Sequence, residues 1–443
     1  MTAQQPVEDI YPLSPMQQGM LFHTLYAPDS GVYISQTSFR VSGEFNPASF
    51  KRALACVVER HAVLRSSFVW KDLDQPVQVV YRNVSIPVRE EDWSGLPEVE
   101  HRQRLEEYLA QDAVQAFDLG RPPLMRFLLA RERKSSFRLV WSLHLLLVDG
   151  WSTARIMGEL FTCHEAFRHE LAPRIEPPRR FREYIAWLAR QDAQQAEGFW
   201  RRELAGVREP TPLPGDRGPG REPALSQSRI LLGEEASEAL QAFARANRLT
   251  VNTLIQGAWS LLISRMSGRQ EVVFGVTIAG RPPELPGAEA MVGPFTNTLP
   301  LRAEAAPEAR LRPWLQQLQD RHSEARQFEH VPLVKIQGWS DLPRGVPLFE
   351  SLMVFESFPV DTALRQRRNG LAIDDFRTRE VTNYPLVLVG HPGPRLTLTL
   401  SWDRSRFEAG TADRLLGYLV RLLEDMVERP EASLESLSHL PSW

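Results

Sequence analysis

Segments with the pattern of a strand alternate with segments with the pattern of a helix along the whole chain, and this alternation constrains the fold more than any other feature. In the first half, apolar residues of 50–58 recur at helical spacing after Asn46, a suitable N-cap followed by Pro47 at the first helical position. Two β-rich runs, 124–132 and 135–148, are separated by a polar turn, which is typical of a hairpin. Because alternating strands and helices pack as layers on a common core, the pattern predicts an α/β fold.

The second half contains the same kinds of element. Residues 250–266 have the pattern of an apolar helix ended by Gly268, and 271–280 have that of a buried strand. Residues 395–402 place apolar side chains at alternate positions, and 415–426 carry the apolar stripe of a long last helix. No residue-level repeat relates the two halves, so their similarity is one of architecture.

Two lobes are expected from this pattern, one from residues 1–175 and one from 176–443. The division follows the proline-rich stretch 171–180, which has the composition of a connection between the halves. A second stretch rich in proline and glycine, 209–223, is predicted to lack regular structure.

Composition excludes several classes of function. Lys and Arg total 52 against 55 Asp and Glu, a net charge of −3, so there is no basic surplus for binding nucleic acid. No window approaches about 18 uncharged apolar residues and the first residues lack a secretory signal, so we expect a cytoplasmic chain with no membrane segment. The histidines are scattered without metal-ligand spacing, and no metal site is predicted. Cys56 and Cys163 fall in helical patterns and are expected to be buried thiols.

His144 interrupts an apolar run and is the first candidate for chemistry. If the strand continues to the end of the run, one face carries Val140, Ser142, His144, Leu146 and Val148. An imidazole among apolar neighbours needs a polar partner, as does the carboxylate of Asp149 that follows. Gly150 permits a tight turn and a close backbone approach by a ligand. The alternative is a core histidine whose hydrogen bond is purely structural.

Residues 144–150, with the sequence His-Leu-Leu-Leu-Val-Asp-Gly, resemble the His-His-x-x-x-Asp-Gly motif of condensation domains in nonribosomal peptide synthetases. Further segments resemble other motifs of that family, in the expected order and over nearly the whole chain. They are 11–23, 60–65, 184–191, 274–282, 291–302, 330–333, 348–359 and 382–386. The chain is therefore identified by resemblance as a condensation domain.

The resemblance implies two lobes, each like chloramphenicol acetyltransferase, arranged as a V-shaped pseudo-dimer with a tunnel between them. It implies that one carrier protein domain brings an acyl donor on its phosphopantetheine arm, that a second brings the acceptor amine, and that an adenylation domain is a neighbour. The amine then attacks the donor thioester to form an amide. No cofactor is expected on the domain itself, since the arm belongs to the carrier; acyl-CoA is the alternative donor.

The sequence departs from the family at Leu145, where the motif has its second histidine, the one credited with the chemistry. Leucine offers no proton acceptor. Three explanations stay open: a laboratory replacement, a natural loss of the base, or a shift of the turn that lets His144 take over. General-base catalysis contributes about 10²–10⁴-fold, whereas positioning two reactants reaches effective molarities of about 10⁵–10⁸ M. A chain with Leu145 could therefore remain a slow catalyst, and its competence is left open.

The resemblance and the local pattern assign roles to other residues around His144. Asp149 is expected to form a structural ion pair with a buried arginine, for which Arg65 is the first candidate, or else to be only a helix-start carboxylate. Ser152 is expected to cap the helix that follows. The backbone N–H of Gly150 would serve as an oxyanion donor.

Four further candidates line or support the expected tunnel. Trp151 is expected to pack rather than react. Arg281 lies in a Gly-Arg-Pro segment that resembles the one crossing between the lobes. Asn297 and Tyr384 are polar residues in apolar motifs, which either reach the tunnel or make structural hydrogen bonds.

The type of donor is a separate question. Val140 and Val148 would make the donor side apolar, which favours a starter domain that accepts a fatty acyl group, and the chain begins close to its first motif, as expected of a starter domain. One alternative is an elongation domain with a peptidyl donor; the form of residues 16–23 resembles that of many domains that follow an epimerising module. The other alternative is a non-catalytic domain that only docks carriers. An epimerisation domain would need the histidine that Leu145 replaces, and a heterocyclisation domain would have an Asp-based motif in place of His144.

Overall fold

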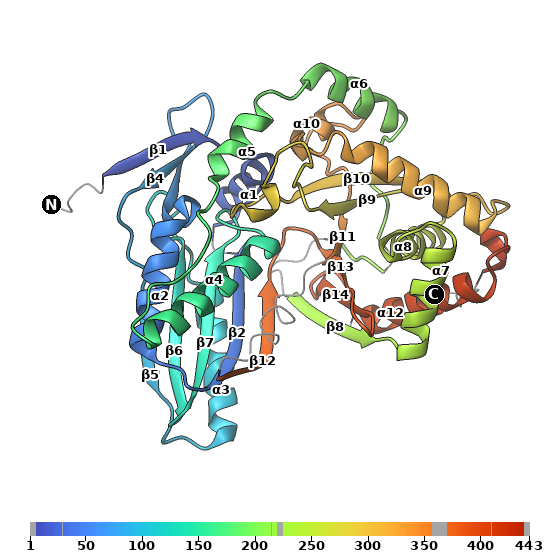
Figure 1. Cartoon of the computed structure of the whole chain (residues 1–443). Helices are drawn as coiled ribbons and strands as arrows, with labels where there is room; N and C mark the ends of the chain where they lie inside the picture. The colour runs from blue at the N-terminus through green and yellow to red at the C-terminus, as the bar shows by residue number, and fades with distance from the viewer. Residues whose placement is uncertain are drawn as a thin grey trace. The chain divides into compact units, whose positions relative to one another are not determined.

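Helices and strands alternate throughout the computed structural model, and the predicted α/β fold is confirmed (Figure 1). The structure describes residues 6–28, 30–213, 215–218, 225–356, 370–408 and 410–437. The chain forms two compact units, each assembled from three separate stretches. Unit 1 consists of Met1–Gln191, Arg281–Thr296 and Phe358–Asn383, and unit 2 of Asp192–Gly280, Asn297–Ser357 and Tyr384–Trp443.

This division differs from the predicted boundary after residue 175. Residues 176–191 belong to unit 1, and the irregular stretch 171–180 lies inside unit 1 instead of joining two lobes. The chain later returns to unit 1 with 281–296 and 358–383. Local composition carries no signal for such a return, because the contacts that define it are made with residues far away in the sequence.

The described residues of unit 1 form a five-stranded sheet in the order β12-β2-β7-β6-β5 and a smaller sheet in the order β1-β4-β3. In the larger sheet β5 runs parallel to β6, and the other neighbours are antiparallel. The strands are β1 (Val7–Pro12), β2 (Ile34–Gly43), β3 (Ser66–Val69), β4 (Val77–Tyr81), β5 (Val88–Asp92), β6 (Met125–Arg133), β7 (Ser136–His144) and β12 (Leu371–Glu380). The helices are α1 (Pro15–Tyr26), α2 (Pro47–Arg60), α3 (Glu98–Ala113), α4 (Gly150–Arg168) and α5 (Phe181–Leu188), with 3₁₀ turns at Ala62–Arg65 and Ala288–Ala290.

The two faces of the larger sheet are covered by different helices. Leu139, Trp141 and Leu143 of β7 belong to a core shared with α2 and α4. On the opposite face Val140 packs in a second core with Leu105 of α3. All of β7 is buried, and its apolar residues contribute to the cores on both faces of the sheet.

Two local predictions in unit 1 are confirmed. Asn46 caps α2 by accepting a hydrogen bond from the Ser49 N–H at 2.9 Å, and Pro47 is the first helical residue. β6 and β7 form the expected antiparallel hairpin, with Arg133 opposite Ser136 at its turn.

β12, which comes late in the chain, is the edge strand of this sheet next to β2. It pairs antiparallel with β2 from Leu371 to Glu380. Arg138 of β7 bridges Glu132 of β6 at 2.9 Å and Asp375 of β12 at 2.9 Å. Because Arg138 and Glu132 are buried, where an unpaired charge is costly, these ion pairs help to hold β12 in the sheet.

The described residues of unit 2 form a six-stranded sheet in the order β10-β9-β11-β13-β14-β8, in which β11 runs parallel to β9 and β13 and the other pairs are antiparallel. The strands are β8 (Leu225–Leu231), β9 (Glu271–Ile278), β10 (Asn297–Glu304), β11 (Ser351–Phe355), β13 (Leu386–His391) and β14 (Thr397–Asp403). The helices are α6 (Ala193–Glu203), α7 (Glu234–Ala246), α8 (Val251–Ser267), α9 (Leu311–Arg326), α10 (Leu333–Gly338) and α12 (Thr411–Glu428), with a 3₁₀ turn at Leu434–Ser436.

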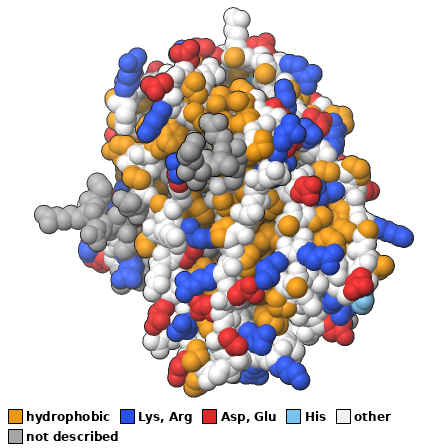
Figure 2. Space-filling model, turned by 90° about the vertical axis from the view of Figure 1, so that its left-hand side faces the viewer, with side chains coloured by type: hydrophobic (Ala, Val, Ile, Leu, Met, Phe, Trp, Pro, Cys, Tyr) orange, Lys and Arg blue, Asp and Glu red, His pale blue; other side chains and the backbone are white. Residues whose placement is uncertain are grey.

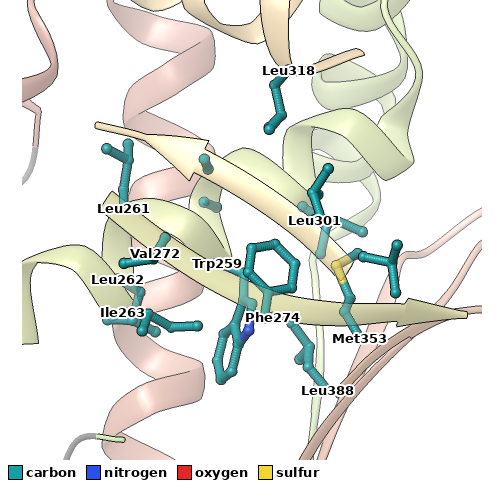
Figure 3. Close-up of a cluster of buried hydrophobic side chains, with 14 of the residues drawn as sticks. Trp259, Leu261, Leu262, Ile263, Val272, Phe274, Leu301, Leu318, Met353 and Leu388 are labelled. Carbon is teal, nitrogen blue, oxygen red and sulfur yellow. The ribbon is translucent and has the colours of Figure 1, made fainter. Parts of the chain in front are cut away.

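The core of unit 2 lies between its sheet and its helices. Figure 3 shows Trp259 of α8 gathered with Phe274 of β9 and Met353 of β11. The predicted apolar helix is confirmed as α8, which follows the N-cap Thr250 and ends at Gly268 with φ of 69°. The predicted strands at 271–280 and 395–402 and the predicted last helix correspond to β9, β14 and α12.

The surface charges and the cysteines of the described residues do not indicate a further functional site. On the face drawn in Figure 2, Lys and Arg side chains are interspersed with Asp and Glu. Within the described ranges no helix is long and apolar enough to cross a bilayer, and no group of three or more His, Cys, Asp or Glu side chains could hold a metal ion. Cys56 and Cys163 are free thiols with their Sγ atoms 4.0 Å apart; Cys163 is buried as expected and Cys56 only partly.

Candidate functional site

Strand β7 ends at His144, so the expected continuation of the strand to residue 148 is wrong. The Leu147 N–H donates to the His144 carbonyl at 3.0 Å and closes a turn. Leu146 and Val148 therefore do not extend the face that carries His144. Residues 146–148 are nevertheless fully buried, and this burial is why their sequence has the apolar character of a strand.

His144 is held by a hydrogen bond at each ring nitrogen. Its Nδ1 accepts from the Leu146 N–H at 3.1 Å, so Nδ1 carries no proton and Nε2 carries it. Nε2 then donates to Thr24 Oγ1 of α1 at 3.2 Å, and that hydroxyl donates to the Met20 carbonyl at 2.8 Å. Complete burial lowers the pKa of His144 to about 3. The imidazole is thus neutral, and its one lone pair is already in use.

Leu145 occupies the first position after the strand. Its N–H donates to the Tyr33 carbonyl at 2.8 Å, and its partly exposed side chain packs against the core beneath α2 and α4. Tyr33 has a left-handed backbone, with φ of 63°, just before β2. The side chain of Leu145 supplies neither a proton acceptor nor a hydrogen-bond donor here.

Asp149 is both the N-cap of α4 and half of a buried ion pair. Its Oδ1 accepts from the Ser152 N–H at 2.7 Å. Arg281 contacts both carboxylate oxygens, with Nη1 at 2.7 Å from Oδ2 and Nη2 at 3.2 Å from Oδ1. The Phe295 N–H also donates to Oδ2 at 3.1 Å. The two expectations for Asp149, ion pair and helix start, are therefore met by the same carboxylate.

Two predictions are wrong, that of Ser152 as the cap of α4 and that of Arg65 as the ion-pair partner of Asp149. Ser152 lies in the first turn of α4, and its Oγ donates to the Gly293 carbonyl at 2.8 Å. Arg65 pairs with Glu8 of β1 at 2.7 Å and donates to the Val58 carbonyl at 3.0 Å. Arg65 follows α2 and is turned toward β1 and β4, which leaves the carboxylate of Asp149 to Arg281.

Arg281 and residues that follow it in the sequence pack against the first turn of α4. The chain passes from unit 2 to unit 1 between Gly280 and Arg281. The Arg281 guanidinium lies 4.3 Å from the ring centroid of Phe295 and 5.2 Å from that of Trp151. Trp151 Nε1 donates to the Glu289 carbonyl at 3.1 Å. Trp151 thus packs on the ion pair, which is the role expected for it.

Gly150 is the first helical residue of α4 and is exposed. A Cβ atom at this position would meet no heavy atom within 4 Å. The space beside Gly150 is therefore open to a ligand, and the backbone N–H groups of the first helical turn lie next to it.

Val140 and Val148 do not lie on a common surface. This contradicts the prediction that they form one apolar face for the donor acyl group. Val140 is fully buried in the core against α3, and Val148 is buried in the core against α2 and α4. Since both side chains are sealed on opposite sides of the sheet, neither can contact a donor acyl group in this structure.

Asn297 and Tyr384 belong to unit 2. Asn297 is buried, and its Nδ2 donates to the carbonyls of Glu329 and Val331, each at 2.8 Å. That geometry fits the structural alternative for Asn297. Tyr384 stacks on Phe349 with ring centroids 5.6 Å apart, and burial raises the pKa of its hydroxyl.

Sequence reasoning missed the residues that hold the motif from outside it. Thr24 follows the segment 11–23 that resembles the opening motif, and Gly293 lies in another such segment. Gly293 is closely packed, since a Cβ there would lie 2.1 Å from Phe181. The presence of these residues in or beside motif segments was a signal, but their partners could not be read from spacing.

A comparison with family models supports the resemblance. The model described as Condensation domain matches residues 7–442. One of the linear gramicidin synthase proteins of Brevibacillus parabrevis is 41% identical over 438 residues, which cover 98% of this chain and 6% of that synthase protein. This chain therefore spans a small part of that relative's length.

Solved structures with the same fold include two of different kinds. The starter condensation domain of rhizomide synthetase, a mutant in complex with C8-CoA and Leu-SNAC, gives a TM-score of 0.83 at 19% identity, covering 97% of each chain. The X-domain in its complex with OxyB from teicoplanin biosynthesis gives 0.82 at 23% identity, covering 98% of this chain and 97% of that one. At these identities the likeness shows the fold alone. Because the family match runs from β1 past the last 3₁₀ turn, the chain belongs to the condensation-domain family.

Proposed function

We propose that this chain is the condensation domain of a nonribosomal peptide synthetase and forms an amide between a donor acyl thioester and an acceptor amine. The observation that carries the proposal is the N-terminus of α4. There the carboxylate of Asp149 is held by Arg281 and by the helix, while the neighbouring Gly150 faces open space.

The start of α4 is suited to a developing negative charge. The first N–H groups of a helix lack partners within it and form the positive end of its dipole. Arg281 neutralises Asp149, so an oxyanion beside Gly150 would not be repelled by a bare carboxylate. We assign the Gly150 N–H as donor to the thioester oxygen in the tetrahedral intermediate, a type of contact worth about 10²–10³ in rate.

Positioning is the main source of catalysis in this proposal. An α-amine has a reference pKa of about 7.7–8.0, so part of it is neutral near pH 7 and ready to attack. Leu145 cannot remove the proton that attack releases, and His144 has no free lone pair. We therefore expect turnover to be slower than with a histidine at position 145.

The substrates would arrive on phosphopantetheine arms of carrier domains, with an adenylation domain as neighbour in the synthetase. In the arrangement that the family resemblance implies, the arms enter from opposite mouths of a tunnel between two lobes. Val140 and Val148 are buried and no longer favour a fatty acyl donor. We propose a peptidyl or aminoacyl donor, as in an elongation domain.

A loaded-carrier assay tests the proposal. The chain is mixed with one carrier bearing a donor and a second bearing an acceptor amino acid, and amide product is followed by mass spectrometry. Product is expected with a peptidyl donor, and at a higher rate in Leu145→His than in the native chain. A fatty acyl carrier and acyl-CoA serve as comparison donors, and faster turnover with either would contradict the donor class.

A non-catalytic docking domain is the second candidate. Leu145 favours it, and the X-domain of similar fold is known in complex with another protein, OxyB. If neither the native chain nor Leu145→His gives product while the chain binds loaded carriers, the docking function replaces the enzymatic one.

A further inference from the structure

A second histidine, His23, lies beside the motif on α1. It precedes Thr24, whose hydroxyl is hydrogen-bonded to His144. His23 is only partly buried, and its ring lies 6.5 Å from that of Tyr33, centroid to centroid. The resemblance placed His23 at the end of the opening motif without assigning it a role.

Tyr33 connects Leu145 to this histidine. The Tyr33 carbonyl accepts from the Leu145 N–H at 2.8 Å, and the Tyr33 N–H donates to the Val381 carbonyl at 2.7 Å. The Tyr33 hydroxyl donates to Asn383 Oδ1 at 2.6 Å. Tyr33 is therefore fixed at both its backbone and its ring, and it joins the turn after β7 to the end of β12.

Asn383 indicates which nitrogen of His23 is free of a proton. Because Asn383 Oδ1 accepts from Tyr33, its Nδ2 is turned toward His23 Nε2 at 3.4 Å. An amide nitrogen is only a donor, so Nε2 is the acceptor in this contact and has no proton. This hydrogen bond is long and Asn383 is exposed, so a substrate amine can replace the Asn383 side chain at His23 Nε2.

The surroundings of His23 favour a neutral imidazole near pH 7. Burial lowers the pKa of His23. Among the segments that meet here, the titratable or charged side chains are Tyr26 of α1, Tyr33, His144 at the end of β7, and Arg379 and Glu380 at the end of β12. The Glu380 carboxylate accepts from Ser35 Oγ at 3.0 Å, so it is already engaged.

We infer that His23 Nε2 is the proton acceptor of the condensation step in this chain, in the role that Leu145 cannot fill. This inference rests on the proposed function. The amine nitrogen forms a bond to the thioester carbon, and the carbon–sulfur bond breaks. The proton released by the amine passes to His23 Nε2 and then to the departing thiolate, which leaves as the free thiol of the phosphopantetheine arm.

The test compares His23→Gln in the native chain and in Leu145→His, in the loaded-carrier assay between pH 5.5 and 9. In the native chain His23→Gln is expected to lower kcat by about 10²–10⁴-fold and to remove the rise of kcat that follows deprotonation of a histidine. In Leu145→His the same change is expected to cost less than about tenfold, because position 145 then supplies the base. His169→Gln, at an exposed histidine directly after α4, is the matched control and should leave kcat unchanged.

Several outcomes would overturn the inference. An unchanged rate and pH profile in His23→Gln would do so while leaving the proposed function intact, since product is still made. An equal loss of kcat in the native chain and in Leu145→His would show that His23 acts only on the structure. If His23→Gln unfolds, His23→Ala is assayed with added imidazole, and recovery of kcat supports the inference whereas a folded variant without recovery contradicts it. No product from either parent chain would instead refute the proposed function.

Discussion

At the scale of single residues, hydrogen bonding decides what each polar group near β7 can do. His144 uses one nitrogen to accept from the turn and the other to hold α1, so its role is to fix two elements in place. Its burial also makes it a source of pH-dependent stability. The folded protein keeps this imidazole neutral far below the pKa of about 6.5 that it has when unfolded.

We predict that part of the loss of stability in acid comes from His144. With a folded pKa of about 3, stability is complete above about pH 6.5 and falls as the pH drops from there toward 3, because only the unfolded chain binds the proton. In His144→Gln, the change in unfolding free energy between pH 7.5 and 5.0 should be smaller than in the native chain by about 2 kcal/mol. Urea unfolding at the two pH values measures this, with exposed His169→Gln as control. Identical pH dependence in native and His144→Gln chains would contradict it.

The ion pair of Asp149 and Arg281 is predicted to be essential for stability. Both side chains are almost fully buried, so Asp149→Ala leaves a buried guanidinium and should lower the unfolding free energy by about 3–5 kcal/mol. Arg182→Ala, which breaks the more exposed pair with Asp9, is the matched control and should cost about 1 kcal/mol or less. Chemical denaturation compares the variants. Similar losses of unfolding free energy in Asp149→Ala and Arg182→Ala would contradict the prediction.

The sequence predicted the identity of the site residues better than their partners. A buried arginine for Asp149 was expected, yet Arg65 and Arg281 are both arginines in motif segments and only the folded chain distinguishes them. The apolar character of Val140 and Val148 was read correctly, but the end of the strand at His144 places them in separate cores. Spacing predicts a residue's face only while the element continues.

At the scale of elements, the hairpin, the capped helices and the long apolar helix follow from local pattern. β12 does not, because six of its ten residues are exposed and its stability depends on partners in β2 and β7. Elements with an amphipathic or capped sequence could thus be located from the sequence, and an element held by distant ion pairs could not.

Arg138 is predicted to control the attachment of β12. Replacing it by Met removes the bridge between Glu132 and Asp375 and leaves the buried Glu132 with one arginine fewer, since Arg40 still contacts it at 2.8 Å. The backbone amides of 371–380 should then exchange with deuterium at least about tenfold faster, while those of α8 are unaffected. Arg377→Ala is the control, because its pairs are largely exposed. Protection of β12 that is unchanged in Arg138→Met would refute the role of the bridge.

At the scale of the whole molecule, each unit is discontinuous in sequence. Unit 1 needs β12 to cover the edge of β2 and needs Arg281 to neutralise Asp149, and both come from beyond residue 191. The predicted division at 175 differs from the observed one for this reason. The alternating pattern of strands and helices predicted the α/β class and two units, but not that each unit is built from separate stretches of the chain.

We predict that residues 1–191 alone do not form a stable unit 1. The fragment has an uncovered β2 edge and a buried, unpaired carboxylate at Asp149, and both features favour association or unfolding. Near-ultraviolet circular dichroism and size-exclusion chromatography should show a fragment without fixed aromatic packing or in aggregates. A monomeric fragment with cooperative thermal unfolding would contradict the prediction.

The late addition of β12 has a consequence for synthesis on the ribosome. At about 5–20 residues per second, the stretch between Gln191 and Glu380 takes about 10–40 s to translate. During that time the nascent chain exposes the unpaired edge of β2, which is a template for contact with other growing chains. Production of this protein should therefore depend on chaperones that shield the edge until the last strand emerges.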